Sequence, residues 1–248
     1  MKNLIITGGW AHDFSSTSST LREVLSTVNS ISGVEQVVVH DINEAADALT
    51  KQNFDVVTVY ACWFTMTDER YTPEQRASWA RTTPPAFIEK MTEHHQRGGG
   101  LLVLHTGIIC FTDWPEWSQW VGGEWVWGQS WHPALEDLVV TRSLEQGSFD
   151  QSNVGVHPIV HDIETIAVHD ERYSDMGIDP ASVILYESAG ANGLQPAAWA
   201  HTYGGSRVIF SSLGHDARSL TNAAHQTLLR RSLAWVAGYP DETVCVVN

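Results

Sequence analysis

The pattern of apolar and polar residues in the first 105 positions predicts alternating strands and helices. Short apolar runs rich in β-branched residues predict strands, and these cover residues 3–7, 34–40, 54–60 and 101–105. The stretches between them predict helices over residues 18–29, 45–51 and 84–96. The last helix begins at a pair of prolines and stops at three successive glycines. Strands that alternate with helices at this spacing indicate a parallel sheet with helices on both faces.

The second half of the chain is less regular. Residues 111–133 hold six of the 11 tryptophans and predict an irregular insertion after the fourth strand. Residues 142–153 have the composition of an inserted surface loop, which we call the excursion. The pattern clears again in a strand pair over 197–203 and 207–213, followed by a helix over 222–237. Neither an internal repeat nor a linker composition interrupts the chain, so a single domain over residues 1–248 is predicted.

The charge balance argues against several classes of partner. Lys and Arg number 14 against 29 Asp and Glu, which gives a formal charge of −15 at pH 7. Such a surface repels the phosphates of nucleic acids and the headgroups of anionic membranes. No apolar stretch approaches the roughly 18 residues of a membrane-spanning helix, and the first ten residues lack the apolar segment of a secretory signal. The three cysteines form no CxxC pair. We therefore expect a soluble, cytoplasmic protein whose partner is a small molecule.

Chemistry-bearing residues follow the predicted strands. In an open parallel sheet, ligands bind beyond the carboxyl ends of the strands. His12 comes shortly after the first strand, His105 ends the fourth, and His215 follows the last. Trp10 and Trp63 stand beside the ends of the first and third strands. These residues are expected to meet at one edge of the sheet, where imidazoles can bind a metal or transfer protons.

A series of motifs accompanies these strand ends. In chain order they are the glycine-closed first strand with His12, then GGGLLVLHTG, DWPEWSQWVGGEW, His157-Pro158-Ile159, Asp170-Glu171-Arg172-Tyr173 and PAAWAHTYGGSRVIFSSLGHD. Together they resemble the trehalose-utilisation ThuA-like family over about residues 3–237. The resemblance implies a flavodoxin-like, doubly wound α/β fold with a mostly parallel sheet, similar to class I glutamine amidotransferases. It also implies a role in the catabolism of disaccharides or glycosides.

The resemblance favours an enzyme that acts on a keto-disaccharide or related glycoside as an isomerase or lyase. It implies that the catalytic residues are His105, His215, Glu171 and Tyr173. Removing a proton next to a carbonyl needs a base, here Glu171 or a histidine, and a donor to the enolate oxygen, here Tyr173 or another histidine. Indole rings offer flat apolar faces for a sugar. The residues expected to bind it are His12, Trp10, Trp63, Trp199 and His157.

Alternatives stay open. His12, His105 and His215 can bind a divalent metal such as zinc or manganese, although their separation in sequence offers no local ligand motif. The amidotransferase relatives carry a nucleophilic cysteine on the turn after a central strand, where this chain has His105. Cys62, at the end of the third strand, offers a hydrolase mechanism instead. A non-catalytic carbohydrate-binding module would use the histidines structurally, and exposed tryptophans could equally form a homo-oligomer contact.

Overall fold

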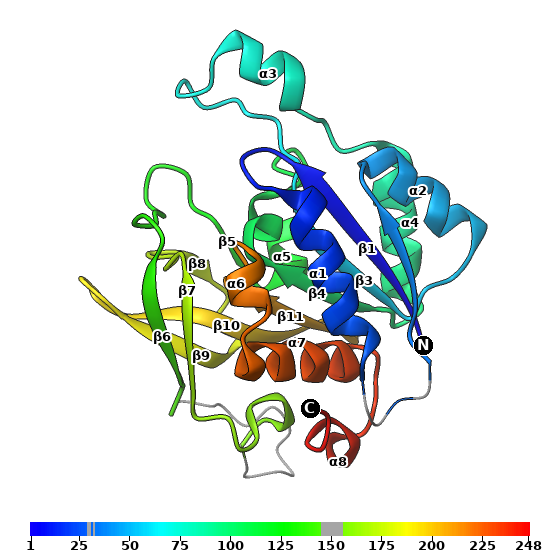
Figure 1. The fold of residues 1–248 in the computed structure, drawn as a ribbon. Helices are drawn as coiled ribbons and strands as arrows, with labels where there is room; N and C mark the ends of the chain where they lie inside the picture. Colours follow the sequence, from blue (N-terminus) through cyan, green and yellow to red (C-terminus); the bar gives the residue numbers. More distant parts are fainter. Residues whose placement is uncertain (29–30, 32, 145–155) are drawn as a thin grey trace.

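The structure is a computed structural model that describes residues 1–28, 31, 33–144 and 156–248 (Figure 1). The excursion predicted over residues 142–153 therefore lies mostly outside the described residues. A nine-stranded sheet runs through the molecule. Its strands, in spatial order, are β2 (Glu35–Val39), β1 (Lys2–Gly9), β3 (Val56–Cys62), β4 (Gly100–Leu104), β11 (Ser206–Ser211), β10 (Gly193–Tyr203), β9 (Val183–Gly190), β6 (Glu136–Arg142) and β7 (Thr165–Asp170).

The sheet has a parallel half and an antiparallel half. Strands β2, β1, β3, β4 and β11 are mutually parallel, and the four predicted N-terminal strands are all among them. Strands β10, β9, β6 and β7 continue the sheet with antiparallel pairing. The tight turn at Gly204-Gly205 joins β10 to β11, and a short connection of this kind permits only antiparallel neighbours. The strand predicted over 197–203 lies in β10, whereas β9, β6 and β7 come from the stretch that the hydrophobic pattern left irregular.

Helices cover both faces of the sheet. Successive strand residues point to opposite faces, so Ile5 shares an apolar cluster with α1 and α7, whereas Leu4 and Ile6 share one with α2 and α4. The short helix α5 contributes Trp117 and Trp120 to the second cluster. These helices are α1 (Phe14–Ser26), α7 (Ala223–Val236), α2 (Ile42–Lys51), α4 (Pro85–Gln96) and α5 (Trp117–Val121). The helical cover on both faces agrees with the alternation of strands and helices in the sequence.

The segment between β3 and α4 contains a helix, although its polar composition is typical of a loop. In α3 (Pro73–Trp79), the Thr72 hydroxyl accepts a hydrogen bond from the Gln75 amide at 3.2 Å, and the Gln75 side chain accepts one from the Thr72 amide at 2.8 Å. The sequence Thr-Pro-Glu-Gln is typical of this reciprocal cap, and it is the signal in the sequence that marks the start of the helix. Figure 1 shows α3 standing away from the sheet at one end of the molecule. The remaining short elements are η1 (His105–Ile109), β5 (Gly123–Glu124), η2 (Pro158–Val160), β8 (Gly177–Ile178), α6 (Ala217–Leu220) and α8 (Asp241–Val244).

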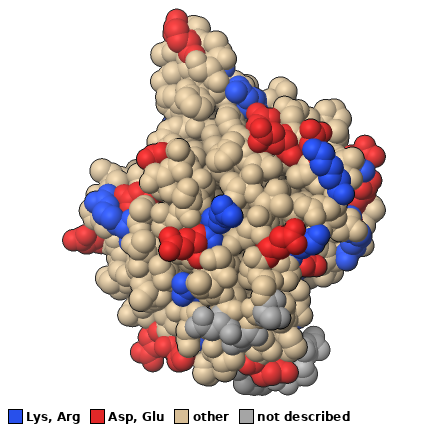
Figure 2. All heavy atoms as spheres, turned by 45° about the vertical axis from the view of Figure 1, so that its right-hand side comes forward, with Lys and Arg blue, Asp and Glu red and all other residues tan. Residues whose placement is uncertain are grey.

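Acidic and basic side chains are interspersed on the surface, although acidic ones are in excess (Figure 2). On the face drawn in Figure 2, Lys and Arg side chains lie scattered among Asp and Glu, and outside the grey residues no basic cluster covers it. Within the described part of the chain, no helix combines the length and the apolar character needed to cross a membrane.

His157 occupies a buried structural position at the start of η2. Its Nδ1 accepts a hydrogen bond from the Ile159 amide at 3.4 Å, and its ring packs edge-on against Trp235 at 4.9 Å between centroids. Burial, together with the smaller effect of the positive charge of Arg207, lowers the pKa of His157 from 6.5 to about 3. The folded protein therefore holds this imidazole neutral over a pH range in which the unfolded chain protonates it.

This difference predicts acid sensitivity. The folded pKa of His157 lies below the unfolded value of 6.5. The contribution of this neutral imidazole to the free energy of unfolding is therefore complete above pH 6.5 and is lost as the pH falls toward 3. The loss is about 1.4 kcal/mol per pH unit within that window. A His157→Phe variant, which keeps a ring against Trp235, should show a correspondingly shallower slope in urea unfolding measured across the window. Equal slopes in both proteins would assign the acid sensitivity to other groups.

Candidate functional site

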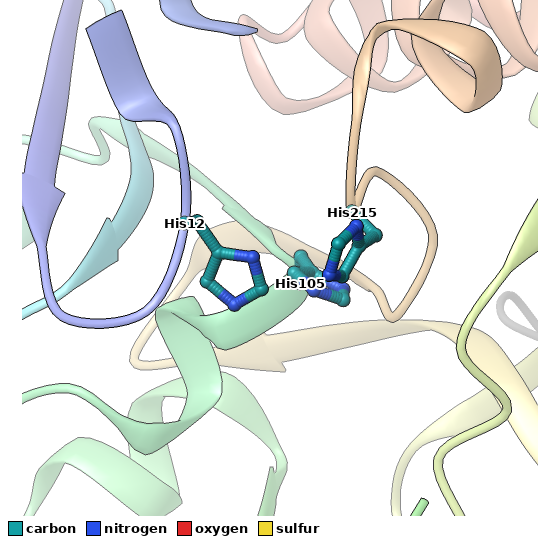
Figure 3. Close-up of side chains that lie close together, drawn as sticks. All are labelled: His12, His105 and His215. Atoms are coloured by element: carbon teal, nitrogen blue, oxygen red, sulfur yellow. The ribbon is translucent and has the colours of Figure 1, made fainter. Parts of the chain in front are cut away.

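Three histidines from different parts of the chain meet at the carboxyl ends of the parallel strands (Figure 3). The His12 ring lies 4.9 Å from the His105 ring and 4.7 Å from the His215 ring, centroid to centroid, and the His105 and His215 rings are 5.5 Å apart. His12 comes from the loop after β1, His105 begins η1 directly after β4, and His215 lies in the loop after β11. The structure thus places side by side the three histidines that the strand-end rule predicts to meet.

The turn that carries His12 depends on glycine. Gly8 and Gly9 have φ values of +97° and +113°, in the left-handed region, and a Cβ on Gly9 would lie only 2.3 Å from the carbonyl oxygen of Cys62. The amide of Trp10 then donates to the same Cys62 oxygen at 3.1 Å. The close approach fixes the loop against the end of β3. His12 is thereby directed toward the other two histidines.

His105 occupies a strained elbow between β4 and η1. Its φ is +51°, a left-handed conformation that is uncommon for a residue with a Cβ and typical of functional sites. The ring is buried, and its Nδ1 lies 2.7 Å from the carbonyl oxygen of Ser212. A carbonyl only accepts, so Nδ1 carries the proton and Nε2 presents its lone pair to the cluster. The fold thus sets both the position and the tautomer of His105.

Asp170 fastens the other half of the site. This fully buried carboxylate ends β7 and accepts hydrogen bonds from the amides of Gly214 at 2.7 Å, His215 at 3.3 Å and Glu171 at 2.8 Å. It therefore ties the loop after β11 to the end of β7. The consequence is that His215 and Glu171 face each other, although 44 residues separate them in the sequence.

Glu171 stands at the centre of the imidazoles. One carboxylate oxygen, Oε2, lies 3.6 Å from His105 Nε2, and the other, Oε1, lies 3.5 Å from His215 Nε2 and 3.4 Å from His132 Nδ1. The hydroxyl of Tyr173 is 3.4 Å from His105 Nε2, and the two rings pack at 5.0 Å. A carboxylate, a phenol and four imidazoles therefore share one site.

The protonation of this site follows from its burial. Burial, together with the smaller effect of the neighbouring imidazoles, lowers the pKa of His12 and of His105 to about 3. Burial raises the pKa of Glu171, against the opposing effect of His132 and His215. Burial also raises the pKa of Tyr173 well above its usual range. At neutral pH the site therefore holds neutral imidazoles at His12 and His105, a protonated phenol at Tyr173 and a Glu171 carboxyl group with a raised proton affinity, which suits proton transfer.

A cavity of about 210 Å³ lies in front of these side chains. Trp10, His12, Glu171, Tyr173 and His215 line it, and His105 lies directly behind them. A second cavity of about 630 Å³ adjoins it across a shared aromatic wall. The residues that border both cavities are Phe64, Ile109, Trp125 and Trp127. The cleft therefore has one compartment rich in titratable groups and a larger compartment rich in aromatic ones.

Three residues predicted to bind substrate lie elsewhere. Trp199 is fully buried on β10, where its indole donates to the Val121 carbonyl at 2.8 Å and packs on Phe210. Trp63 is buried too, and its indole donates to the Thr7 carbonyl at 3.2 Å. His157 packs on Trp235 at the opposite end of the strands. The structure therefore corrects these assignments, because both indoles point into the core and not into the cleft.

Other site residues escaped the sequence reasoning. His132 contacts Glu171 and borders the smaller cavity, and its signal was its place as the only histidine in the tryptophan-rich segment 111–133. Arg70 and Tyr71 also border this cavity, from the segment whose pattern suggested a polar loop. Trp125 and Trp127 belong to the predicted tryptophan cluster, but periodicity alone could not separate them from the buried Trp114, Trp117 and Trp120.

Cys62 borders the smaller cavity, yet its environment does not activate it. The thiol is buried at the end of β3, and burial raises its pKa to about 12. A nucleophilic cysteine needs a lowered pKa so that the thiolate is present at neutral pH. Burial also raises the pKa of Cys110 well above its usual range. Both cysteines therefore behave as small buried apolar residues, which disfavours the cysteine-hydrolase alternative.

Comparison with known proteins yields a family and related folds. The family model ThuA, described as trehalose utilisation, matches residues 2–236. Among solved structures, a ThuA-like protein from Parabacteroides merdae is similar at a TM-score of 0.71 and 19% identity, over 96% of this chain and 90% of that one. A ThuA-like protein from Bacteroides uniformis is similar at 0.63 and 15% identity, over 95% and 91% of the two chains.

Part of a larger protein shows the same fold. A β-galactosidase from Rahnella sp. R3 is similar at a TM-score of 0.57 and 13% identity, and the similarity covers 97% of this chain but 32% of the galactosidase. At these identities the similarity concerns the fold alone. A search of curated proteins found no match to the sequence.

Proposed function

Because this chain belongs to the ThuA family of trehalose utilisation, we propose that it is an enzyme that isomerises or eliminates a sugar derivative by acid–base catalysis. The substrate class is a keto-disaccharide or a related glycoside that carries a carbonyl group. The observation that carries this proposal is the position of Glu171, whose carboxylate oxygens lie 3.4–3.6 Å from three imidazoles at the wall of the smaller cavity.

The side chains divide the chemistry between a base and a donor. The Glu171 carboxylate takes the proton from the carbon next to the substrate carbonyl, and the electron pair of that C–H bond moves to the carbonyl oxygen to give an enolate. The Tyr173 hydroxyl donates a hydrogen bond to this oxygen. For an isomerisation, the proton returns from Glu171 to the former carbonyl carbon, and the proton of the adjacent hydroxyl passes to the former carbonyl oxygen, so the carbonyl moves by one carbon. For an elimination, the enolate re-forms the carbonyl, the C–O bond to a β-alkoxy group breaks, and Glu171 gives its proton to the departing oxygen.

The aromatic wall supports a sugar as the ligand. Trp10 and Tyr71 border the smaller cavity, and Trp125 and Trp127 border both. Flat apolar rings of this kind can stack on the C–H face of a sugar while polar groups hold its hydroxyls. Trp127 remains 37% exposed, so it has a free surface for such a contact. The larger cavity beyond this wall can hold the part of a glycoside that does not react.

Solvent exchange tests the proposal directly. The protein is incubated in D₂O with disaccharides oxidised at one ring carbon, and with the unoxidised sugars as the matched control, while proton NMR follows each C–H signal. We expect loss of the signal next to the carbonyl, at a rate proportional to protein concentration, and no exchange in the unoxidised sugars. Binding of the oxidised sugar without exchange or turnover would favour a carbohydrate-binding module. Hydrolysis that alkylation of Cys62 abolishes would favour the cysteine mechanism.

A further inference from the structure

The three histidines of the site face one another in a way that proton transfer alone does not require. His12, His105 and His215 each offer a ring nitrogen, and these three nitrogens all lie within 4.8 Å of one another. A site that needed one base would not need three imidazoles in mutual ring contact. Lone pairs that converge on one point are favourable when a cation or a hydrogen-bond donor occupies that point.

The hydrogen bonds around the rings leave nitrogen atoms available at the centre. His105 donates its Nδ1 proton to the Ser212 carbonyl, which leaves Nε2 as the acceptor. A backbone carbonyl behind a ligating imidazole is a common way to orient it toward a metal. The Nδ1 atoms of His12 and His215 are buried and have no hydrogen-bond partner among the described residues. Asp216 Oδ2 lies 3.9 Å from His215 Nδ1, which is too long for a hydrogen bond. Buried polar atoms are nearly always hydrogen-bonded, so these two nitrogen atoms indicate a missing ligand.

Carboxylates close to the cluster offset a positive charge. Glu171 lies 3.5 Å from His215 and 3.6 Å from His105, and the buried Asp170 holds the amide of His215. A buried cation needs such partners, because an uncompensated charge in this environment is very costly. Histidine-rich donor sets with an adjacent carboxylate are typical of zinc, whereas manganese prefers mainly oxygen ligands.

We propose that His12, His105 and His215 bind one zinc ion, with a fourth position open toward the cavity. Zinc–nitrogen bonds of about 2.0–2.1 Å require the three nitrogens to approach one another by at most roughly 1.5 Å. Side-chain rotation supplies this movement, because His12 and His215 lie in loops. An ion in this position would lie beside a substrate oxygen and offset the negative charge that develops on it. Glu171 stays outside the ligand set and remains the base.

Metal binding can be measured without any substrate. Protein that carries no affinity tag is stripped with a chelator and titrated with ZnCl₂ by calorimetry, and CoCl₂ serves as a spectroscopic probe of geometry. We expect one zinc per chain and the intense visible bands of four-coordinate cobalt. His12→Gln and His215→Gln should each weaken zinc binding by at least about 100-fold, a larger effect than the loss of an outer partner.

A matched control separates these histidines from their neighbour. His132→Gln removes an imidazole that contacts Glu171 in the same site but is not one of the three proposed ligands. The zinc affinity of this variant should stay within about threefold of the parent protein. Loss of an outer partner that orients a metal ligand would instead weaken binding by about 10–100-fold. Circular dichroism checks that each variant is folded, and the loop variants keep the test valid if a change at the buried His105 prevents folding.

Two results would overturn the zinc site: no zinc binding by the stripped parent protein, or equal affinity in the parent and in the His12→Gln and His215→Gln variants. Binding of manganese but not zinc would overturn the choice of metal. The proposed acid–base function is judged separately by solvent exchange, so its failure is distinguishable from failure of the metal site.

Discussion

Replacing Glu171 with glutamine is expected to lower kcat by about 10³-fold while the protein stays folded. Glutamine has nearly the same shape, so the contacts of 3.4–3.6 Å to His105, His132 and His215 can persist. The amide cannot accept the proton that the carboxylate takes from substrate. Binding should therefore survive while turnover fails. The measurement is kcat and KM for the sugar identified by solvent exchange.

Stability distinguishes this result from a damaged fold. Burial raises the pKa of Glu171, which means that the folded environment penalises its charge. Removing that charge should leave the free energy of unfolding unchanged or higher, the trade-off expected where function and stability conflict. Glu89→Gln is the matched control, because Glu89 is exposed on α4 and lies outside both cavities. A loss of less than about tenfold in the Glu171 variant would instead assign proton transfer to His132 or His215.

The parallel half of the fold was predictable because its strands β1, β3 and β4 are buried on both faces. In the sequence such strands are continuous apolar runs, as in Val56–Cys62. The helices that connect them follow at regular spacing. The antiparallel half shows weaker signals. In β6, buried and exposed residues alternate only from Asp137 to Thr141, and β7 is similar. The pairing of β6 with β9 joins segments about 45 residues apart, and a local pattern does not encode such a contact.

The candidate site likewise has residues that the sequence could predict and residues that it could not. His12, His105 and His215 were found because the carboxyl ends of parallel strands meet at one edge, a rule that needs only strand positions. Trp199 was misplaced because its strand is antiparallel, and one step in register decides whether a side chain faces the core or the cleft. His132 was missed because its contact with Glu171 joins an irregular loop to a strand end. Asp170 was read as part of a motif, but its three amide partners become visible only in the folded structure.

Replacing Asp170 with alanine is expected to destabilise the protein by at least about 3 kcal/mol, because three amides lose a charged acceptor and two of these hydrogen bonds are buried. The carboxylate is fully buried at the end of β7 and receives these bonds from Glu171, Gly214 and His215. Urea unfolding measures the loss. Asp137→Ala is the matched control, because the Asp137 side chain is 98% exposed and its ion pair with His169 contributes less than about 1 kcal/mol.

The same substitution should loosen the site before it unfolds the domain. Gly214 has a φ of +123°, so the loop after β11 is held in a left-handed conformation partly by its bond to Asp170. Without that bond, hydrogen exchange at the Gly214 and His215 amides should accelerate far more than exchange in β3 or β4, whose ladder bonds are untouched. Uniform acceleration across the sheet would mean that Asp170 stabilises the fold as a whole. Acceleration confined to the loop would mean that this carboxylate holds His215 in the histidine cluster, which makes Asp170 a positioning residue.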